Sequence, residues 1–247
     1  MATKLAHHSK QVGKCFNPDT IHKLRTLFKK FRALLRWQAA GKKVYSDFKK
    51  VYNQAGAIRN LQVAQQILKE DTLTSAAFNA WLTARLTRLE KEWGCTDHKR
   101  PLKQLLEGIS NLEIICSKHN NFFEKKMKKI QQIINDAVVT DNSIHDCRKA
   151  MKDIQYVCAY CEKKNASSRS IKKIPVQQIK AITEQVGAFN DQCLLINLLE
   201  NFTVGKTLSL TQANMLDIWG KKRYATRKAL ISSIRHLKRY RSNNAQL

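Results

Sequence analysis

The chain has 247 residues, and its 45 lysines and arginines outnumber 19 aspartates and glutamates, which gives a formal net charge of +26. A compact protein with this charge repels itself, so the composition favours a polyanionic partner such as nucleic acid, an anionic membrane surface or a phosphate polymer. The hydrophobic content of 43% excludes a disordered basic tail, and only 8 glycines and 3 prolines predict an all-α protein with few turns.

Cysteine usage and hydropathy indicate the compartment. The 7 cysteines are scattered through a chain whose first residues carry no apolar signal-peptide core, which predicts free thiols in a reducing compartment. No apolar run approaches the roughly 18 residues of a membrane span, so we expect no membrane insertion. The expected location is therefore the cytoplasm.

In chain order, the apolar periodicity predicts a series of long helices. The segment 1–16 is a candidate for one further helix, and residues 163–175 are expected to form a polar loop. The longest predicted helix is expected to break near 119–121, where the sequence reads HNN. The predicted helices lie near residues 19–40, 43–69, 73–93, 99–138, 142–163, 175–201 and 207–242.

Two pairs of segments recur in the same order. IHKLRTLFKKFRALLRW, from Ile21, and IHDCRKAMKDIQYVCAY, from Ile144, share only four identical positions, but their apolar positions correspond throughout. Each is followed by a second related segment, GAIRNLQVAQQIL from Gly56 and GAFNDQCLLINLL from Gly187. An internal duplication explains this order and spacing. It predicts two helical halves, 1–140 and 141–247.

The first helix carries a basic stripe on one side. At 100° per residue, a histidine and four cations fall within an arc of about 80° and span about 21 Å. No acidic residue interrupts this arc, whereas solvated helix faces usually alternate the sign of their charges. A compact anion needs only two or three of these groups, but a linear polyanion can use all of them. The basic stripe consists of His22, Arg25, Lys29, Arg32 and Arg36.

The second copy of this helix keeps the geometry with fewer charges. His145, Arg148 and Lys152 repeat the first three positions of the stripe, while Gln155 and Ala159 replace the last two. The opposite side of each helix is apolar and is expected to face the core. These apolar residues are Leu24, Leu27, Phe28, Phe31, Leu34 and Leu35 in the first copy, and Cys147, Met151, Ile154, Val157 and Cys158 in the second.

Both histidines are expected in the first turn of their helices, after N-caps at Asp19 or Thr20 and at Ser143. A helix N-terminus disfavours a cationic imidazole and favours bound anions. The two imidazoles therefore suit donation of an N–H to a phosphate oxygen.

At these residues the sequence resembles the CHAD family, the conserved histidine α-helical domain. The pattern H-x-x-R-x-x-x-K starts at His22 and again at His145, and each copy precedes a Gly-Ala segment, so the resemblance covers essentially the whole chain. It implies two four-helix-type halves, related by pseudo-two-fold symmetry, around a central basic channel that binds inorganic polyphosphate. Catalysis is not known in the family, so we expect no enzyme activity and no cofactor or metal.

The resemblance places phosphate contacts on the basic residues of both copies and puts a contact by Gln155 in doubt. It also implies that the basic last helix lines the channel, together with lysines near Lys125 and Lys129. The expected polyphosphate-binding residues are His22, Arg25, Lys29, Arg32, His145, Arg148 and Lys152, with Arg36 from the stripe, Arg59 from the first Gly-Ala segment, and Arg223 and Arg227 from the last helix, where Lys238 and Arg241 share their side. Association with polyphosphate granules is then expected.

Two alternatives remain beside this interpretation. Sequence-non-specific nucleic-acid binding is the chief one, because a charge of +26 attracts DNA and RNA as well, and weak nucleic-acid binding is expected in any case. A polyphosphate hydrolase would need a metal-binding carboxylate cluster that the pair His145–Asp146 alone does not supply. The C-x-x-C of Cys158 and Cys161 lies on the apolar side of its helix, which favours core packing over metal or redox chemistry.

Overall fold

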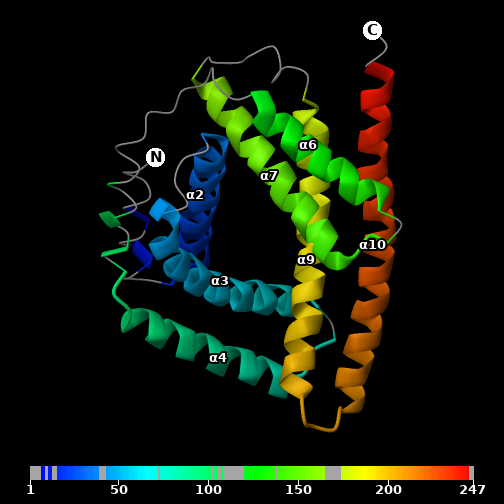
Figure 1. The fold of residues 1–247 in the computed structure, drawn as a ribbon. Helices are drawn as coiled ribbons and strands as arrows, with labels where there is room; N and C mark the ends of the chain where they lie inside the picture. The colour runs from blue at the N-terminus through cyan, green and yellow to red at the C-terminus, as the bar shows by residue number, and fades with distance from the viewer. Residues whose placement is uncertain are drawn as a thin grey trace. The chain divides into compact units, whose positions relative to one another are not determined.

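The computed structural model describes residues 7–8, 11–12, 16–38, 43–71, 73–98, 100–101, 103–104, 107, 120–136, 138–164 and 174–244, with the side chains of 43–48, 120 and 237–244 left out. Within these residues the long elements are seven α-helices, and no strand occurs, which confirms the predicted all-α class (Figure 1). The helices are α2 (Pro18–Trp37), α3 (Lys43–Glu70), α4 (Ala76–Gly94), α6 (Asn120–Asn135), α7 (Asp141–Lys163), α9 (Val176–Thr203) and α10 (Leu210–Asn244).

The helix boundaries follow local capping. α6 begins at the predicted break, while most of 99–119 and the loop residues 165–173 lie outside the described residues. α10 begins at Leu210, three residues later than predicted, because Ser209 and Gln212 cap it reciprocally. The Ser209 Oγ accepts from the Gln212 N–H at 3.3 Å, and the Gln212 Oε1 accepts from the Ser209 N–H at 3.1 Å.

The chain divides into two compact units. The first unit comprises Met1–Ile114 and Asn197–Met215, and the second comprises Ile115–Ile196 and Leu216–Leu247. These units follow the compactness of the structure, whereas the predicted halves 1–140 and 141–247 follow the sequence repeat. The two halves, the internal duplication and the central channel therefore stay predictions. α6, which carries Lys125 and Lys129, packs against α7 within the second unit.

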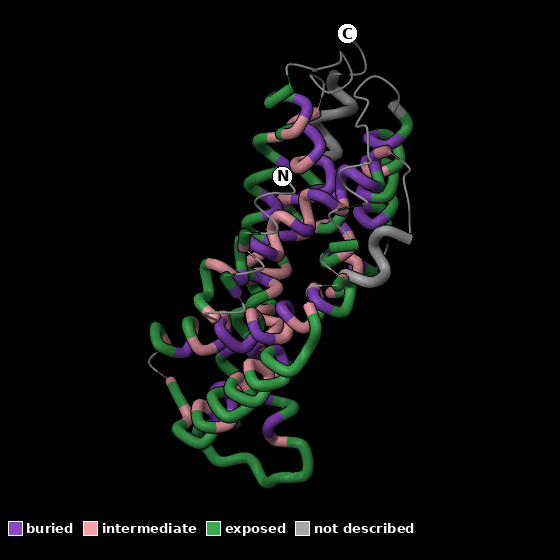
Figure 2. Tube along the Cα trace, turned by 90° about the vertical axis from the view of Figure 1, so that its left-hand side faces the viewer, coloured by how far each residue is buried: buried purple, intermediate pink, exposed green. Residues whose placement is uncertain are grey.

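The apolar side of α2 builds the core of the first unit. Leu24, Phe28 and Phe31 are buried against residues of α3. Buried and exposed residues alternate along the helices (Figure 2). Val12, from the segment expected to add a helix, is also fully buried in this cluster. Full burial of a leucine or phenylalanine side chain contributes about 1.5–3 kcal/mol, so this side anchors the helix and leaves the basic stripe on the other.

α7 builds the core of the second unit in the same way. Its five predicted apolar residues, Cys147, Met151, Ile154, Val157 and Cys158, are all fully buried. α6 is held against α7 by an ion pair between Lys126 Nζ and Asp153 Oδ2 at 2.5 Å, in which the aspartate side chain is only 3% exposed. Breaking such a pair leaves a buried charge without compensation, so Lys126 is part of the fold.

The buried thiols of α7 are expected to be chemically inert. Burial raises the pKa of Cys147 and of Cys158 to about 12, so almost no thiolate forms at neutral pH. Among the described cysteines Cys95 is exposed, whereas Cys161 is buried like Cys147 and Cys158. We expect timed alkylation followed by mass spectrometry to show rapid modification of Cys95, whereas the three cysteines of α7 react only after unfolding. Rapid native modification of Cys158 would contradict this packing.

Candidate functional site: the basic faces of α2 and α7

The N-terminus of α2 places His22 two or three residues further into the helix than predicted. Asn17 is the N-cap, because its side chain accepts from the Asp19 N–H at 2.8 Å and Pro18 follows at the first helical position. The prediction of Asp19 or Thr20 as the cap is therefore wrong. His22 lies five residues after the true cap.

α7 begins at the same distance from its histidine as α2 does. Its N-cap is Thr140, whose Oγ1 accepts from the Ser143 N–H at 3.1 Å, so the predicted cap at Ser143 is also wrong. His145 again lies five residues after the cap. Because the helix dipole acts mainly within the first turn, it has little influence on either imidazole.

Arg25 is held by contacts with α3. Its Nη1 donates to the Tyr52 carbonyl at 2.9 Å, and its Cζ lies 4.5 Å from the centre of the Tyr52 ring. The Cζ of Arg32 lies 5.9 Å from the same ring, so two guanidinium groups of the basic stripe share one aromatic partner. A Cβ atom at Gly56 would lie only 2.2 Å from the Arg25 Nη1. The glycine of the first Gly-Ala segment therefore leaves the room that Arg25 needs.

A corresponding contact is present between α7 and α9. The Arg148 Nε donates to the Thr183 carbonyl at 3.5 Å, and a Cβ atom at Gly187 would lie 3.5 Å from the Arg148 Nη2. Tyr52 and Thr183 both stand four residues before their Gly-Ala segment. A guanidinium carries five N–H donors, so one bond to a carbonyl does not exhaust its capacity for an anion.

Like charges are crowded on the first face. Burial lowers the pKa of His22 from its ordinary value, and Arg59 and Lys29 lower it further, while Asp19 opposes them. The pKa of Arg25 is also lowered, first by burial and then, among the cations, by Arg59 and Arg32. Arg59 on α3 therefore lies close to the stripe, as its inclusion among the expected binding residues requires.

The second face shows the same crowding around Lys152. Burial lowers the pKa of Lys152, with Arg148 as the next cause; Lys180 lowers it too, while Glu184 raises it. Lys180, on α9, was missed from the sequence. The signal was present, because Lys180 and Lys49 both stand seven residues before their Gly-Ala segment.

The lowered pKa of His22 predicts a pH dependence of anion binding. A bound polyanion stabilises the imidazolium, so affinity is expected to rise as the pH falls through the range in which His22 takes up its proton. Without an anion the sign for folding is opposite, because the unfolded imidazole takes up its proton at a higher pH, and stability declines below about pH 6.5. Titration at several pH values checks this, with His22→Gln expected to lose that share of the dependence; an unchanged pH profile in the variant would contradict it.

Arg223 and Arg227 of α10 are engaged at the N-terminus of α7. Their guanidinium groups lie 3.6 Å and 3.1 Å from the two carboxylate oxygens of Asp141, and Arg227 also donates to the Val139 carbonyl. These contacts tie α10 to the start of α7, so a phosphate contact by either arginine stays a prediction and has to compete with Asp141. The side chains of Lys238 and Arg241 lie outside the described residues.

The remaining predicted residues lie along the same two faces. Arg36 and His145 are exposed, whereas Lys29, Arg32, Arg59, Arg148 and Lys152 are half-buried. Each face thus combines partly desolvated cations with an exposed group, Arg36 on α2 and His145 on α7. Partial burial strengthens an ionic contact because less water screens it.

The described residues show no metal site at the pair His145–Asp146. In the part of the chain that the structure describes, no group of three His, Cys, Asp or Glu residues could hold a metal ion. Asp146, the acidic member of the pair His145–Asp146, instead forms ion pairs with Lys149 at 2.9 Å and Lys129 at 3.3 Å. The hydrogen bond from Lys149 is the main reason that the pKa of Asp146 lies below its ordinary value.

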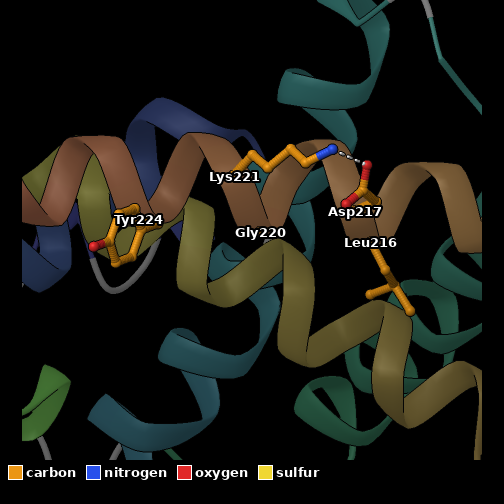
Figure 3. A pocket seen from close by; sticks show the side chains of 5 residues that line it. All are labelled: Leu216, Asp217, Gly220, Lys221 and Tyr224. Carbon is orange, nitrogen blue, oxygen red and sulfur yellow. Dashed lines mark hydrogen bonds and ion pairs between the residues drawn. The ribbon is translucent and has the colours of Figure 1, made fainter.

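A shallow hollow on α10 does not suit a polyanion. It is lined by one side of the helix, from Leu216 to Tyr224, and contains an ion pair between Lys221 Nζ and Asp217 Oδ2 at 2.7 Å (Figure 3). The carboxylate of Asp217 already compensates the lysine and would repel a phosphate.

None of the described helices is long and apolar enough to cross a membrane.

Comparison with known proteins identifies the family. The chain is similar to the CHAD domain in the crystal structure from the plant Ricinus communis, with a TM-score of 0.61, 16% sequence identity, and coverage of 95% of this chain and 87% of that one. At this identity the likeness shows the fold alone. No curated protein matches the sequence. The family model of the CHAD domain matches residues 2–200, which includes both basic helices and both Gly-Ala segments, and the chain therefore belongs to the CHAD domain family.

Proposed function

We propose that the protein binds inorganic polyphosphate, without catalysis, through the basic faces of α2 and α7. The observation that carries this proposal is the crowding of cations on each face: Arg59 joins the basic stripe beside His22, and Lys152 stands beside Arg148. An anion placed among these groups relieves their mutual repulsion. Membership of the CHAD family supports the choice of a phosphate polymer as that anion.

The chemistry of the two faces suits a linear phosphate chain. Arginine forks bind phosphate oxygens in pairs, and lysine adds a compact charge. The anchoring of Arg25 on the Tyr52 carbonyl reduces the entropy that its guanidinium would lose on binding. Counterion release from the polymer would make the affinity steeply dependent on salt. Cytoplasm and polyphosphate granules stay the predicted location.

The competing proposal is sequence-non-specific binding of nucleic acid. Such proteins stack bases on accessible aromatic rings, each worth about 1–3 kcal/mol. In the described residues Trp37, Trp93 and Trp219 are buried, and the Tyr52 ring is occupied by Arg25 on its face and by Phe28 at 4.7 Å. The aromatic ring beside the basic stripe, Tyr52, therefore supports the arginines, which favours a polymer without bases on this face.

A competition titration tests the proposal. The purified protein is bound to labelled long-chain polyphosphate at near-physiological and at high salt, and is then challenged with duplex DNA, RNA and orthophosphate. We expect polyphosphate to resist a charge-matched excess of nucleic acid, and a variant with His22, Arg25 and Lys29 all changed to Ala to lose that preference. Equal competition by every polyanion, with complete release at high salt, would instead identify a general cationic surface.

A further inference from the structure

Gln155 takes the place in the second copy that Arg32 has in the first, yet it is built into the basic face. Its Oε1 accepts from the Lys152 Nζ at 3.0 Å, and its Nε2 donates to the Thr183 Oγ1 at 2.8 Å. The Thr183 hydroxyl in turn donates to the Lys180 carbonyl at 2.9 Å. These bonds form one chain from the lysine of the basic face to the backbone of α9.

The direction of each bond in this chain is determined by the last one. Thr183 is fully buried, and its single hydroxyl proton is given to the Lys180 carbonyl, so its oxygen can only accept from Gln155. The amide of Gln155 must then turn its NH2 group toward Thr183 and its oxygen toward Lys152. A lysine can only donate, so this orientation is the one that holds its ammonium group.

We propose that Gln155 and Thr183 are positioning residues, which hold the Lys152 ammonium on the second basic face in the orientation that binds a phosphate of the polymer. This inference rests on the proposed function and identifies the residues that prepare one of its contacts. Gln155 is thus a support for a neighbouring phosphate ligand and makes no phosphate contact of its own.

Charge explains why an amide suits this position. Burial is the main cause that lowers the pKa of Lys152; the nearby Arg148 and Lys180 lower it further, and Glu184 opposes them. A further cation at position 155 would add to this repulsion, whereas the glutamine amide fixes the lysine without adding charge. In the first copy the corresponding residues work differently, because the Tyr52 ring lies beneath both Arg25 and Arg32.

The test compares Gln155→Leu, Thr183→Val, Thr183→Ser and Lys152→Met in the full chain. We expect Gln155→Leu and Thr183→Val each to weaken polyphosphate binding about fivefold, which corresponds to one hydrogen bond of ordinary net strength, whereas Thr183→Ser keeps the hydroxyl and binds as the parent. In the Lys152→Met background, Gln155→Leu should have no further effect on affinity. Additive losses in that double variant would overturn the proposal.

A second readout needs no ligand. The acylation rate of Lys152, measured by mass spectrometry relative to exposed Lys163, should rise in Gln155→Leu and in Thr183→Val, because the ammonium is released from its acceptor. If the parent protein fails to bind polyphosphate but these rates change as expected, the proposed function fails and the positioning role stands. Unchanged Lys152 rates in Gln155→Leu, which does not alter the buried threonine, would overturn the positioning role itself.

Discussion

Changing Lys29 and Arg32 together to Ala is expected to weaken polyphosphate binding about 100-fold. A charge-assisted contact contributes at least about 1.5 kcal/mol, two of them about 3 kcal/mol, and each 1.4 kcal/mol corresponds to a factor of ten. The two side chains are half-buried on the side of α2 opposite its core residues. The helix should therefore keep its fold, which circular dichroism and thermal melting check beside the binding titration.

The matched control removes the same charge from the same helix. Lys23 and Lys30 lie roughly 80–100° around α2 from His22, outside the arc of the basic stripe. Their double change to Ala should weaken binding only about two- to threefold, because it lowers the general charge without removing a contact of the basic stripe. Equal losses in both double variants would mean that net charge, and not the geometry of the stripe, determines binding.

Gly56→Ala is expected to displace Arg25 and to weaken polyphosphate binding about tenfold, the equivalent of one charge-assisted contact. The added Cβ would lie 2.2 Å from the Arg25 Nη1, so the guanidinium, at the end of a flexible side chain, has to move. It then loses the Tyr52 carbonyl and the Tyr52 ring. Alanine gains about 1 kcal/mol over glycine inside a helix, whereas the lost charged hydrogen bond costs about 1.5–3 kcal/mol, so the net change is a destabilisation of about 1 kcal/mol.

Gly187→Ala is the control for this variant, because the same substitution meets a different contact. Its added Cβ would lie 3.5 Å from the Arg148 Nη2, an ordinary van der Waals distance. The helix preference for alanine then prevails, and stability should rise by up to about 1 kcal/mol with binding unchanged. Urea denaturation and titration of both variants measure the contrast. Stabilisation by both substitutions would show that Arg25 does not need the space at Gly56.

Much of the fold could be predicted from the sequence because helix periodicity is local information. The buried sides of α2 and α7 agree with the predicted apolar residues, from Leu24 and Phe28 to Cys158. The caps were less predictable, since several polar residues precede each basic helix. The cap that forms is the one whose side chain reaches the free N–H groups, which is Asn17 ahead of Pro18 in α2 and Thr140 in α7.

The partners of the basic residues could not be predicted, because they come from other helices. The sequence shows Arg25 and Gly56 as members of recurring segments but contains no sign that one leaves room for the other. Likewise, nothing near Arg223 and Arg227 indicates that Asp141 lies against them. Such contacts depend on how helices pack, so the sequence identifies candidate ligands and the structure shows which of them already have a role in the fold.

Lysine footprinting in the presence and absence of long-chain polyphosphate tests the central claim most directly. The rate of acylation at each lysine is measured by mass spectrometry at near-physiological salt. The account predicts strong protection of Lys29 and Lys152 by the polymer, with exposed Lys91 and Lys163 modified at nearly unchanged rates. Even protection of all four lysines, or protection that spares Lys29 and Lys152, would contradict binding through the basic faces of α2 and α7.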